Sequence, residues 1–467
     1  MKTTVIFCLL SLVFCGYSQT SDTQYAMPLS DVIKDIEERY GIIIRDPEHL
    51  IPGKTITYAR WRYRVDVEQT LSNVLTTVDL AAQKEGDLKY KLKKYQYHRT
   101  SVEEGREKLD YLSGLYHDQA TWESRKAELR PCLFKALQLD PLPKSPGTKP
   151  IISNKRKKEG YTIENIAIET LPGLYVCGSI YKPLKIKGKA PVILCPNGHA
   201  PTGRYNADVQ KRCAMFARMG AITINYDLFA YGESLLQFKP EDHRRSLASS
   251  IQALNSIRIL DYLTSLPEAD GNRIAITGAS GGGSHTMLIT ALDDRIKVSA
   301  PVVMLSCYFY GGCPCESGMP IHLCGNGTSN VELAAMAAPR PQLVVSDGGD
   351  WSDHVPTIEY PFLKTIYGYY NQVENVENAH FPDEGHDYAL SKRIPVYRFM
   401  AKHLGLDLTK SLNKAGETDE SACIAEEEKE MKAFGEKGEL LPANAIRNFE
   451  ELEKVFNEAV NFVTLAE

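Results

Sequence analysis

The stretch Arg273-Ile-Ala-Ile-Thr-Gly-Ala-Ser-Gly-Gly-Gly-Ser-His-Thr-Met-Leu288 joins a short apolar run to a helix-compatible segment. Ser280 stands at the junction, between Gly278 and Gly282. The spacing G-x-S-x-G between a strand and a helix is typical of a nucleophile elbow. Neighbours without a Cβ atom let the chain turn sharply and leave the serine hydroxyl exposed. The stretch therefore predicts that Ser280 is a nucleophile.

The same loop has a second interpretation, the glycine-rich loop of short-chain dehydrogenases, in which a strand delivers a dinucleotide pyrophosphate to a helix N-terminus. That pattern requires glycine at positions 278, 282 and 284, but position 284 is serine. It also opens its domain, whereas this loop lies well inside one. The elbow is favoured, and its partners must be found elsewhere in the chain.

The composition indicates a globular protein of two or three domains, because 467 residues are too many for one ordinary domain. Hydrophobic residues make up 43% of the chain and charged residues 24%, so a large core can form. The net charge of −5 argues against nucleic acid as the main partner, since phosphate binding needs a basic surface.

The N-terminus resembles a secretory signal peptide. Lys2 precedes the apolar run 5–14, and small residues follow at Gly16 and Ser18. We expect cleavage after Ser18, a signal peptide over 1–18 and a secreted or periplasmic protein without a membrane span. Lipidation at Cys15 is the alternative, but the bulky Phe14 precedes it.

Export permits disulfides. Outside the signal peptide nine cysteines remain, an odd number, and four of them lie close together: Cys307, Cys313, Cys315 and Cys324. C-P-C is not the paired C-x-x-C spacing of a zinc site. We expect one or two disulfides plus buried thiols, and no metal.

The order of segments predicts four parts after the signal peptide: a small α+β domain over 19–100, a helical and proline-rich connector over 101–150, a catalytic α/β domain over 151–403, and a helical C-terminal extension over 404–467. A capping-box pattern at Asp66 and Gln69 begins one helix of the first part. Residues 28–98 resemble the small N-terminal domain of secretins and TonB-dependent receptors, through L-x-x-V, Y-G-I-x-I and L-x-x-V-L. That resemblance implies contacts with other proteins; a plain α+β appendage is the alternative.

Strands and helices alternate over 160–403, which favours a mostly parallel sheet with helices on both faces. Eight strands are expected at 166–168, 175–180, 191–194, 221–224, 273–277, 298–305, 342–345 and 373–379, with helices at 207–218, 247–265 and 284–292. The serine after the fifth of eight strands is typical of the α/β-hydrolase fold.

The acid of a catalytic triad should follow the strand at 342–345, because hydrolases of this fold have the chain order Ser, acid, His. Asp347, Asp350 and Asp353 compete there. The run L-V-V-S-D-G-G-D favours Asp350, with Asp353 next. Asp347 is expected to make hydrogen bonds within a turn.

The base should lie in the loop after the last strand, where Pro-Asp-Glu-Gly-His-Asp-Tyr contains His386. His380 lies in or near the strand and is expected to be a packed histidine, while His354 and His285 lack the required position. Backbone amides should stabilise the oxyanion. We expect one from Gly281 and the other from Gly198 or His199; His199 has substrate contact or helix capping as alternatives.

Four motifs together resemble bacterial carbohydrate esterases of the α/β-hydrolase superfamily: P-N-G-H, Y-D-L-F-A-Y-G-E-S, G-A-S-G-G-G and D-E-G-H-D-Y. The chain is similar to the pectin methylesterases of carbohydrate esterase family 19 and to acetyl xylan esterase-like proteins, over about residues 120–410. The resemblance implies ester hydrolysis through an acyl-enzyme on Ser280, without a metal or organic cofactor. The partner it implies is an oligo- or polysaccharide.

Cationic residues would suit a methyl ester of galacturonic acid, since its neighbours in pectin carry carboxylates. Arg204 is the first candidate, with Arg244 and Arg245, and Trp351 is a candidate for stacking on a sugar. Each has an ordinary alternative, as a surface arginine or a core tryptophan. We therefore favour a pectin methylesterase over an acetylesterase, and both over a peptidase or a non-catalytic binding protein.

Overall fold

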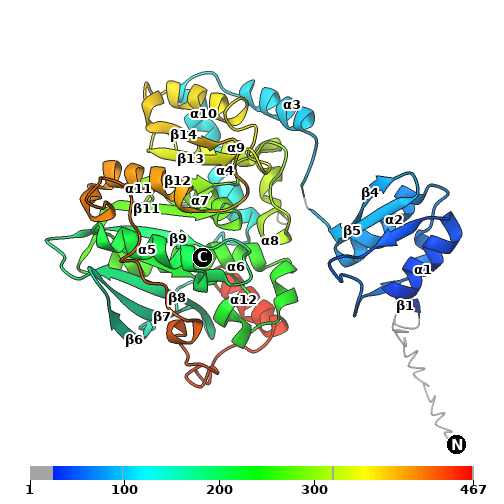
Figure 1. The fold of residues 1–467 in the computed structure, drawn as a ribbon, viewed down its shortest axis with the longest axis horizontal. Coiled ribbons are helices and arrows are strands. Elements are labelled where there is room, and N and C mark those ends of the chain that lie inside the picture. Colours follow the sequence, from blue (N-terminus) through cyan, green and yellow to red (C-terminus); the bar gives the residue numbers. More distant parts are fainter. Residues whose placement is uncertain (1–24, 97, 318–319, 465–467) are drawn as a thin grey trace, which may run out of the picture. The chain divides into compact units, whose positions relative to one another are not determined.

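The computed structural model describes residues 25–96, 98–317 and 320–464, with side chains up to Val460. The signal peptide expected over 1–18 lies outside these residues. The chain divides into two compact units, up to Gln96 and from Tyr97 onward (Figure 1). Among the helices of the described part, no stretch is both long and apolar enough to span a membrane.

The first unit combines short strands with two helices around its own small core. Its elements are β1 (Ala26–Pro28), α1 (Leu29–Tyr40), β2 (Ile43–Arg45), β3 (Thr55–Thr57), α2 (Val67–Leu75), β4 (Leu80–Gly86) and β5 (Lys89–Lys94). The side chain of Asp66 accepts the amide of Gln69 at 2.8 Å and begins α2, as the capping pattern predicts. Strands β2, β5 and β4 form one sheet, and β1 and β3 form another.

The second unit is built on one nine-stranded sheet, in the order β14-β13-β12-β11-β9-β10-β8-β7-β6. The strands are β6 (Ile151–Lys157), β7 (Tyr161–Leu171), β8 (Leu174–Pro183), β9 (Ala190–Pro196), β10 (Ile222–Tyr226), β11 (Ala269–Ala279), β12 (Val298–Val302), β13 (Gln342–Asp347) and β14 (Val376–Phe381). Strands β9 to β14 pair in parallel, and β6, β7 and β8 are antiparallel additions. The α/β-hydrolase class is confirmed.

The expected count of eight strands is corrected to nine. The additional strand is β6, which pairs with β7 at the edge of the sheet. Its sequence, Ile-Ile-Ser-Asn-Lys-Arg-Lys, is mostly polar and only partly buried. An edge strand that pairs with a neighbour on one side only and is largely exposed lacks the apolar pattern on which the sequence prediction depended.

Helices cover both faces of the sheet (Figure 1). Helices α5 (Ala207–Arg218) and α11 (Leu390–Leu404) pack on one face. The opposite face carries α6 (Ala248–Ser265), α7 (Gly281–Leu292), α9 (Asn330–Ala335), α10 (Glu359–Gly368) and α12 (Phe449–Thr464). A separate hydrophobic core lies on each face of the sheet. Val192 and Leu194 of β9 pack in one core and Ile193 in the other, because successive strand side chains point to opposite faces.

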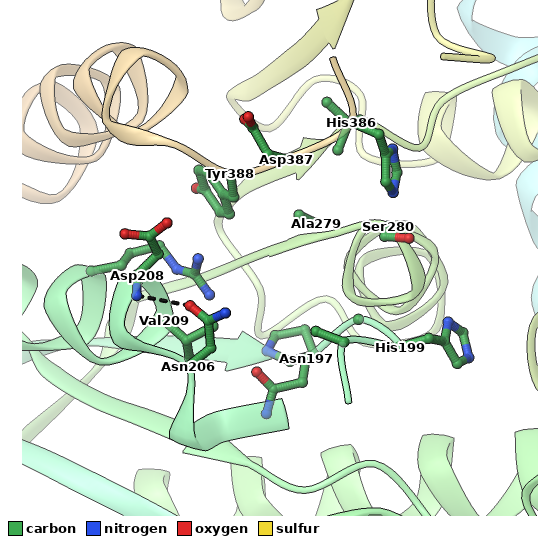
Figure 2. Close-up of a pocket in the computed structure, with 15 residues that line it drawn as sticks. Asn197, His199, Asn206, Asp208, Val209, Ala279, Ser280, His386, Asp387 and Tyr388 are labelled. Carbon is green, nitrogen blue, oxygen red and sulfur yellow. Dashed lines mark hydrogen bonds between the residues drawn. The ribbon is translucent and has the colours of Figure 1, made fainter. Parts of the chain in front are cut away.

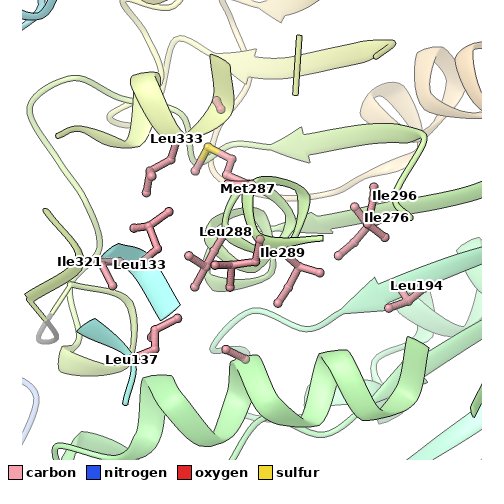
Figure 3. Packing of buried hydrophobic residues seen from close by; sticks show 14 of the residues in the cluster. Leu133, Leu137, Leu194, Ile276, Met287, Leu288, Ile289, Ile296, Ile321 and Leu333 are labelled. Carbon is pink, nitrogen blue, oxygen red and sulfur yellow. The ribbon is translucent and has the colours of Figure 1, made fainter. Parts of the chain in front are cut away.

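The segment expected as a connector is part of the second unit. It forms α3 (Val102–Ser113) and α4 (Gln119–Ala136), and Pro131 lies inside α4. Leu133 and Leu137 pack in the core near Leu288 of α7 (Figure 3). A disulfide between Cys132 and Cys324 joins α4 to the loop that contains the clustered cysteines. The segment thus helps to hold the helix that follows Ser280.

Candidate active site

Ser280 lies at a strained turn between β11 and α7. Its backbone has φ 57° and ψ −126°, a conformation that a non-glycine residue rarely adopts. A Cβ atom at Gly278 would lie 2.6 Å from the carbonyl oxygens of Gly282 and Pro196, and one at Gly282 would collide with Pro196. Glycine is therefore required on both sides of Ser280, because the turn around Ser280 packs directly against the end of β9 at Pro196.

His386 and Asp350 lie in contact. Nδ1 of His386 donates to Oδ2 of Asp350 at 2.5 Å, and the Asp350 side chain is 3% exposed. The other carboxylate oxygen accepts the amide and the hydroxyl of Ser352, each at 2.6 Å. These bonds hold the carboxylate in place. With Nδ1 as the donor, the lone pair of a neutral imidazole lies on Nε2, which is the tautomer a general base needs.

Two glycines let the acid loop approach the histidine loop. A Cβ atom at Gly348 would collide with the carbonyl of Pro382, and one at Gly349 would lie 2.7 Å from the carbonyl of Glu384. The Gly-Gly pair before Asp350 therefore has a steric purpose. It allows the loop after β13 to reach the loop that carries His386.

The competing aspartates have other partners. Asp353 pairs with His354 and accepts the hydroxyl of Tyr308. Asp347 accepts the amide of Gly349 at 3.1 Å, which is the turn bond expected of it. Asp350 is the acid that this geometry offers to His386.

The remaining histidines considered as bases are also engaged elsewhere. His380, in β14, bonds to the hydroxyl of Ser346 at 2.9 Å. His285 is buried in α7 and bonds to Gln252 at 2.9 Å. Burial lowers the pKa of His285 to about 3, so it is neutral at ordinary pH.

The residues expected to form the oxyanion hole lie close together beside Ser280. Gly281 is the first residue of α7, where an amide has no partner inside the helix. The loop after β9 packs against this turn: a Cβ atom at Gly198 would lie 3.1 Å from Cβ of Ser280 and 3.5 Å from the nitrogen of Gly281. The ring of His199 lies over Gly281. The three expected oxyanion residues thus surround the elbow.

A pocket of about 430 Å³ opens at this point. It is lined by Pro196, Asn197, Gly198, His199, Ala200, Asn206, Asp208, Val209, Arg212, Ala279, Ser280, Val303, His386, Asp387 and Tyr388. Figure 2 shows the imidazole of His386 directed toward the turn that carries Ser280. The structure therefore brings Ser280, His386, Gly198 and His199 to one cavity.

Two expected substrate residues, Arg204 and Trp351, are not among the described residues that line this pocket. Arg204 is completely buried and forms ion pairs with Asp227, at 2.9 Å, and Glu233. Trp351 packs against His386, with ring centres 4.5 Å apart. The expectation for Arg204 is corrected, because its ion pairs with buried carboxylates hold it inside the protein. Trp351 is partly buried against the imidazole, and its stacking on a sugar stays a prediction.

Arg212 is a cation at the pocket that the sequence prediction missed. It lies on the same face of α5 as Asp208, and its guanidinium stacks on Tyr388, 4.3 Å from the ring centre. No carboxylate of the described residues forms an ion pair with it. Residues four apart on a helix share one face, so the position of Arg212 on the helix after the β9 loop is a signal by which it could have been found.

A second group of side chains lies next to the site. The ligand atoms of His199, His243, Cys313 and Cys315 are all within 4.8 Å of one another. The expectation of one or two disulfides plus buried thiols is confirmed by the disulfide between Cys132 and Cys324 and by the buried, free Cys313 and Cys315. The sequence prediction missed the two histidines that lie beside these thiols. C-P-C has no zinc spacing by itself, but the fold adds two histidines from distant segments.

The fold and the Ser280, His386 and Asp350 arrangement define a carboxylic ester hydrolase of the α/β-hydrolase class. The solved structure of methylesterase BT1017 is similar over 96% of this chain and 100% of its own, with 47% identity and a TM-score of 0.76. This chain belongs to the family of that methylesterase.

Other comparisons cover less of the molecule. The acetyl xylan esterase family (AXE1) matches residues 250–311, which include the elbow. Acetyl esterase Axe7A from Xylanibacter ruminicola is 28% identical over 138 residues, 26% of this chain, and the match spans only 30% of that relative's length. A glucuronoyl esterase from Solibacter usitatus has 16% identity and a TM-score of 0.43, over 61% of this chain and 94% of its own.

Proposed function

We propose that the protein is a serine esterase that removes methyl groups from galacturonic acid methyl esters in pectin. The observation that carries the proposal is the 47% identity to a methylesterase along its whole length, together with Ser280, His386 and Asp350 in one arrangement. We propose the outside of the cell or the periplasm as its place of action, in keeping with the N-terminal residues.

The reaction has two steps. Nε2 of His386 takes the hydroxyl proton of Ser280 while Oγ attacks the ester carbonyl, and the amides at Gly281 and Gly198 or His199 bind the oxyanion. Collapse of the tetrahedral intermediate breaks the bond to methoxide, which receives the proton from His386 and leaves as methanol. Water, activated by the same histidine, then releases the galacturonate from Ser280.

Product analysis tests this assignment. The full chain is incubated with highly methylated pectin fragments and, separately, with acetylated xylan, and methanol and acetate are measured. We expect methanol from pectin at a rate well above any release of acetate. An acetyl esterase is the second candidate, favoured by the family match at residues 250–311; acetate as the sole product would establish it and contradict our proposal.

Arg212 supports an acidic substrate. Its guanidinium borders the pocket without a carboxylate partner among the described residues, while the two acidic residues there are engaged: Asp208 with Arg393 at 3.2 Å and Asp387 with Lys392 at 2.8 Å. A free galacturonate carboxylate next to the methylated sugar would supply the missing anion. We propose that Arg212 binds it.

Replacing Arg212 with glutamine should therefore raise KM for partly methylated pectin. We expect a change of about 10- to 100-fold, the effect of losing one hydrogen bond to a charged group. Turnover of a small neutral ester, such as p-nitrophenyl acetate, should change little. Lys211→Gln, which removes a neighbouring charge that does not line the pocket, is the matched control. Equal losses on the charged and neutral substrates would contradict a role in carboxylate binding.

A further inference from the structure

Four potential metal ligands converge beside the oxyanion loop from three separate segments. His199 follows β9, His243 lies in the short helix η6 (Pro240–Arg244), and Cys313 and Cys315 flank the start of α8 (Pro314–Ser317). Nε2 of His199 lies 3.0 Å from Nε2 of His243 and 3.0 Å from Sγ of Cys315. His243, Cys313 and Cys315 are buried.

The orientation of His243 is fixed by a bond outside the cluster. Its Nδ1 donates to the carbonyl oxygen of Phe229 at 2.7 Å, so Nε2 carries the lone pair that faces His199. A backbone carbonyl in this position is the usual outer partner of a metal-binding histidine, because it fixes the tautomer and the direction of the ring. The tautomer of His243 is therefore the one that binds a metal.

We propose that His199, His243, Cys313 and Cys315 bind one Zn²⁺ ion. Two thiolates and two imidazoles are a donor set that zinc prefers, and it binds them tetrahedrally. Atoms at 2.0–2.3 Å from a common centre lie ~3.3–3.8 Å apart, so the cluster needs only small shifts to surround an ion. Four protein ligands leave no open position, so the site is structural and takes no part in activating water.

The ion has a consequence for the active site, and this consequence rests on the proposed esterase mechanism. His199 directly follows Gly198, whose backbone packs against Ser280. A zinc ion would bind the oxyanion loop to the segment around Cys313 and to η6. It would therefore hold the backbone amides of this loop at the position where negative charge develops.

Metal analysis of the purified full-length protein tests the site. We expect about one zinc per chain by mass spectrometry of the wild type and of Ser280→Ala, which should keep the metal and lose turnover. His243→Ala and the double variant Cys313→Ser/Cys315→Ser should lose the zinc. Cys423→Ser, a buried cysteine outside the cluster, is the matched control and should keep it. These measurements do not depend on ester hydrolysis, so they separate failure of the site from failure of the proposed function.

Cobalt substitution and activity measurements add independent readouts. Co²⁺ bound by two thiolates should give visible and near-ultraviolet absorption that the double variant lacks. Loss of the zinc should lower kcat by up to ~10²–10³-fold, the range for one oxyanion donor. The proposal is overturned by a wild-type protein that neither contains nor binds zinc, by a disulfide between Cys313 and Cys315, by another metal at one equivalent, or by zinc that persists in the double variant.

Discussion

Ser280→Ala should abolish ester hydrolysis, with kcat falling by roughly 10⁶-fold, the loss found when the nucleophile of a serine hydrolase is removed. The methyl group that remains cannot form the acyl-enzyme, and neither His386 nor the oxyanion amides can replace the missing Oγ. Substrate binding should persist, because the pocket and Arg212 are unchanged. Initial rates of methanol release from methylated pectin, with enzyme concentrations raised for the variant, measure the effect.

The control for this substitution lies on α7, the helix that directly follows Ser280. Ser284→Ala removes a hydroxyl that donates to Glu316 at 2.9 Å and does not line the pocket. We expect it to keep at least about a tenth of the wild-type kcat, since only an ordinary hydrogen bond is lost. Wild-type turnover by Ser280→Ala, with its folding verified by thermal unfolding, would disprove the acyl-enzyme mechanism.

Asp350→Asn should lower kcat by about 10³- to 10⁴-fold, the magnitude seen when the acid of such a triad becomes an amide. The Asp350 carboxylate accepts the Nδ1 proton of His386 and, on its other oxygen, two bonds from Ser352. An amide NH₂ directed at His386 would favour the tautomer with its proton on Nε2. In that tautomer the histidine cannot accept the proton of Ser280.

Asp353→Asn is the matched control, because Asp353 lies in the same loop and contacts His354 and Tyr308 in place of His386. We expect its kcat to remain within about tenfold of the wild type. Both variants are compared at the same pH on the same methyl ester. A large loss confined to Asp353→Asn would show that the loop rearranges during turnover and that Asp353 is the working acid.

Local sequence signals were sufficient for most of the hydrolase fold. Helix α5 was expected over 207–218, which are its bounds, and eight of the nine strands lie where alternation and apolar runs indicate them. Such signals depend on residues a few positions apart and on burial of both faces of a strand. The polar edge strand β6 has one open side and gives no such signal.

In the site, too, some residues were predictable from local sequence and others only from packing. Ser280 is recognisable because an elbow is a local structure, and its glycines are required within five residues. Asp350 and His386 follow from chain order, but three aspartates within seven residues fit that order equally. Only the packing of Gly349 on the loop before His386, which depends on two distant strands meeting, distinguishes Asp350 from Asp353.

By itself, then, the sequence determined the α/β-hydrolase class, and it predicted the nucleophile and the segments that carry its partners, because each prediction depends on short-range spacing or on chain order. The tertiary structure alone decided which cation lines the pocket and which sulfur atoms lie beside His199. The sequence does not distinguish Arg204 from Arg212. In the structure Arg204 pairs with buried carboxylates, whereas Arg212 lines the pocket. Likewise Cys313 and Cys315 join His199 and His243 only where three loops converge. Distances between residues far apart in the chain arise from packing of the whole core, and no local pattern contains them.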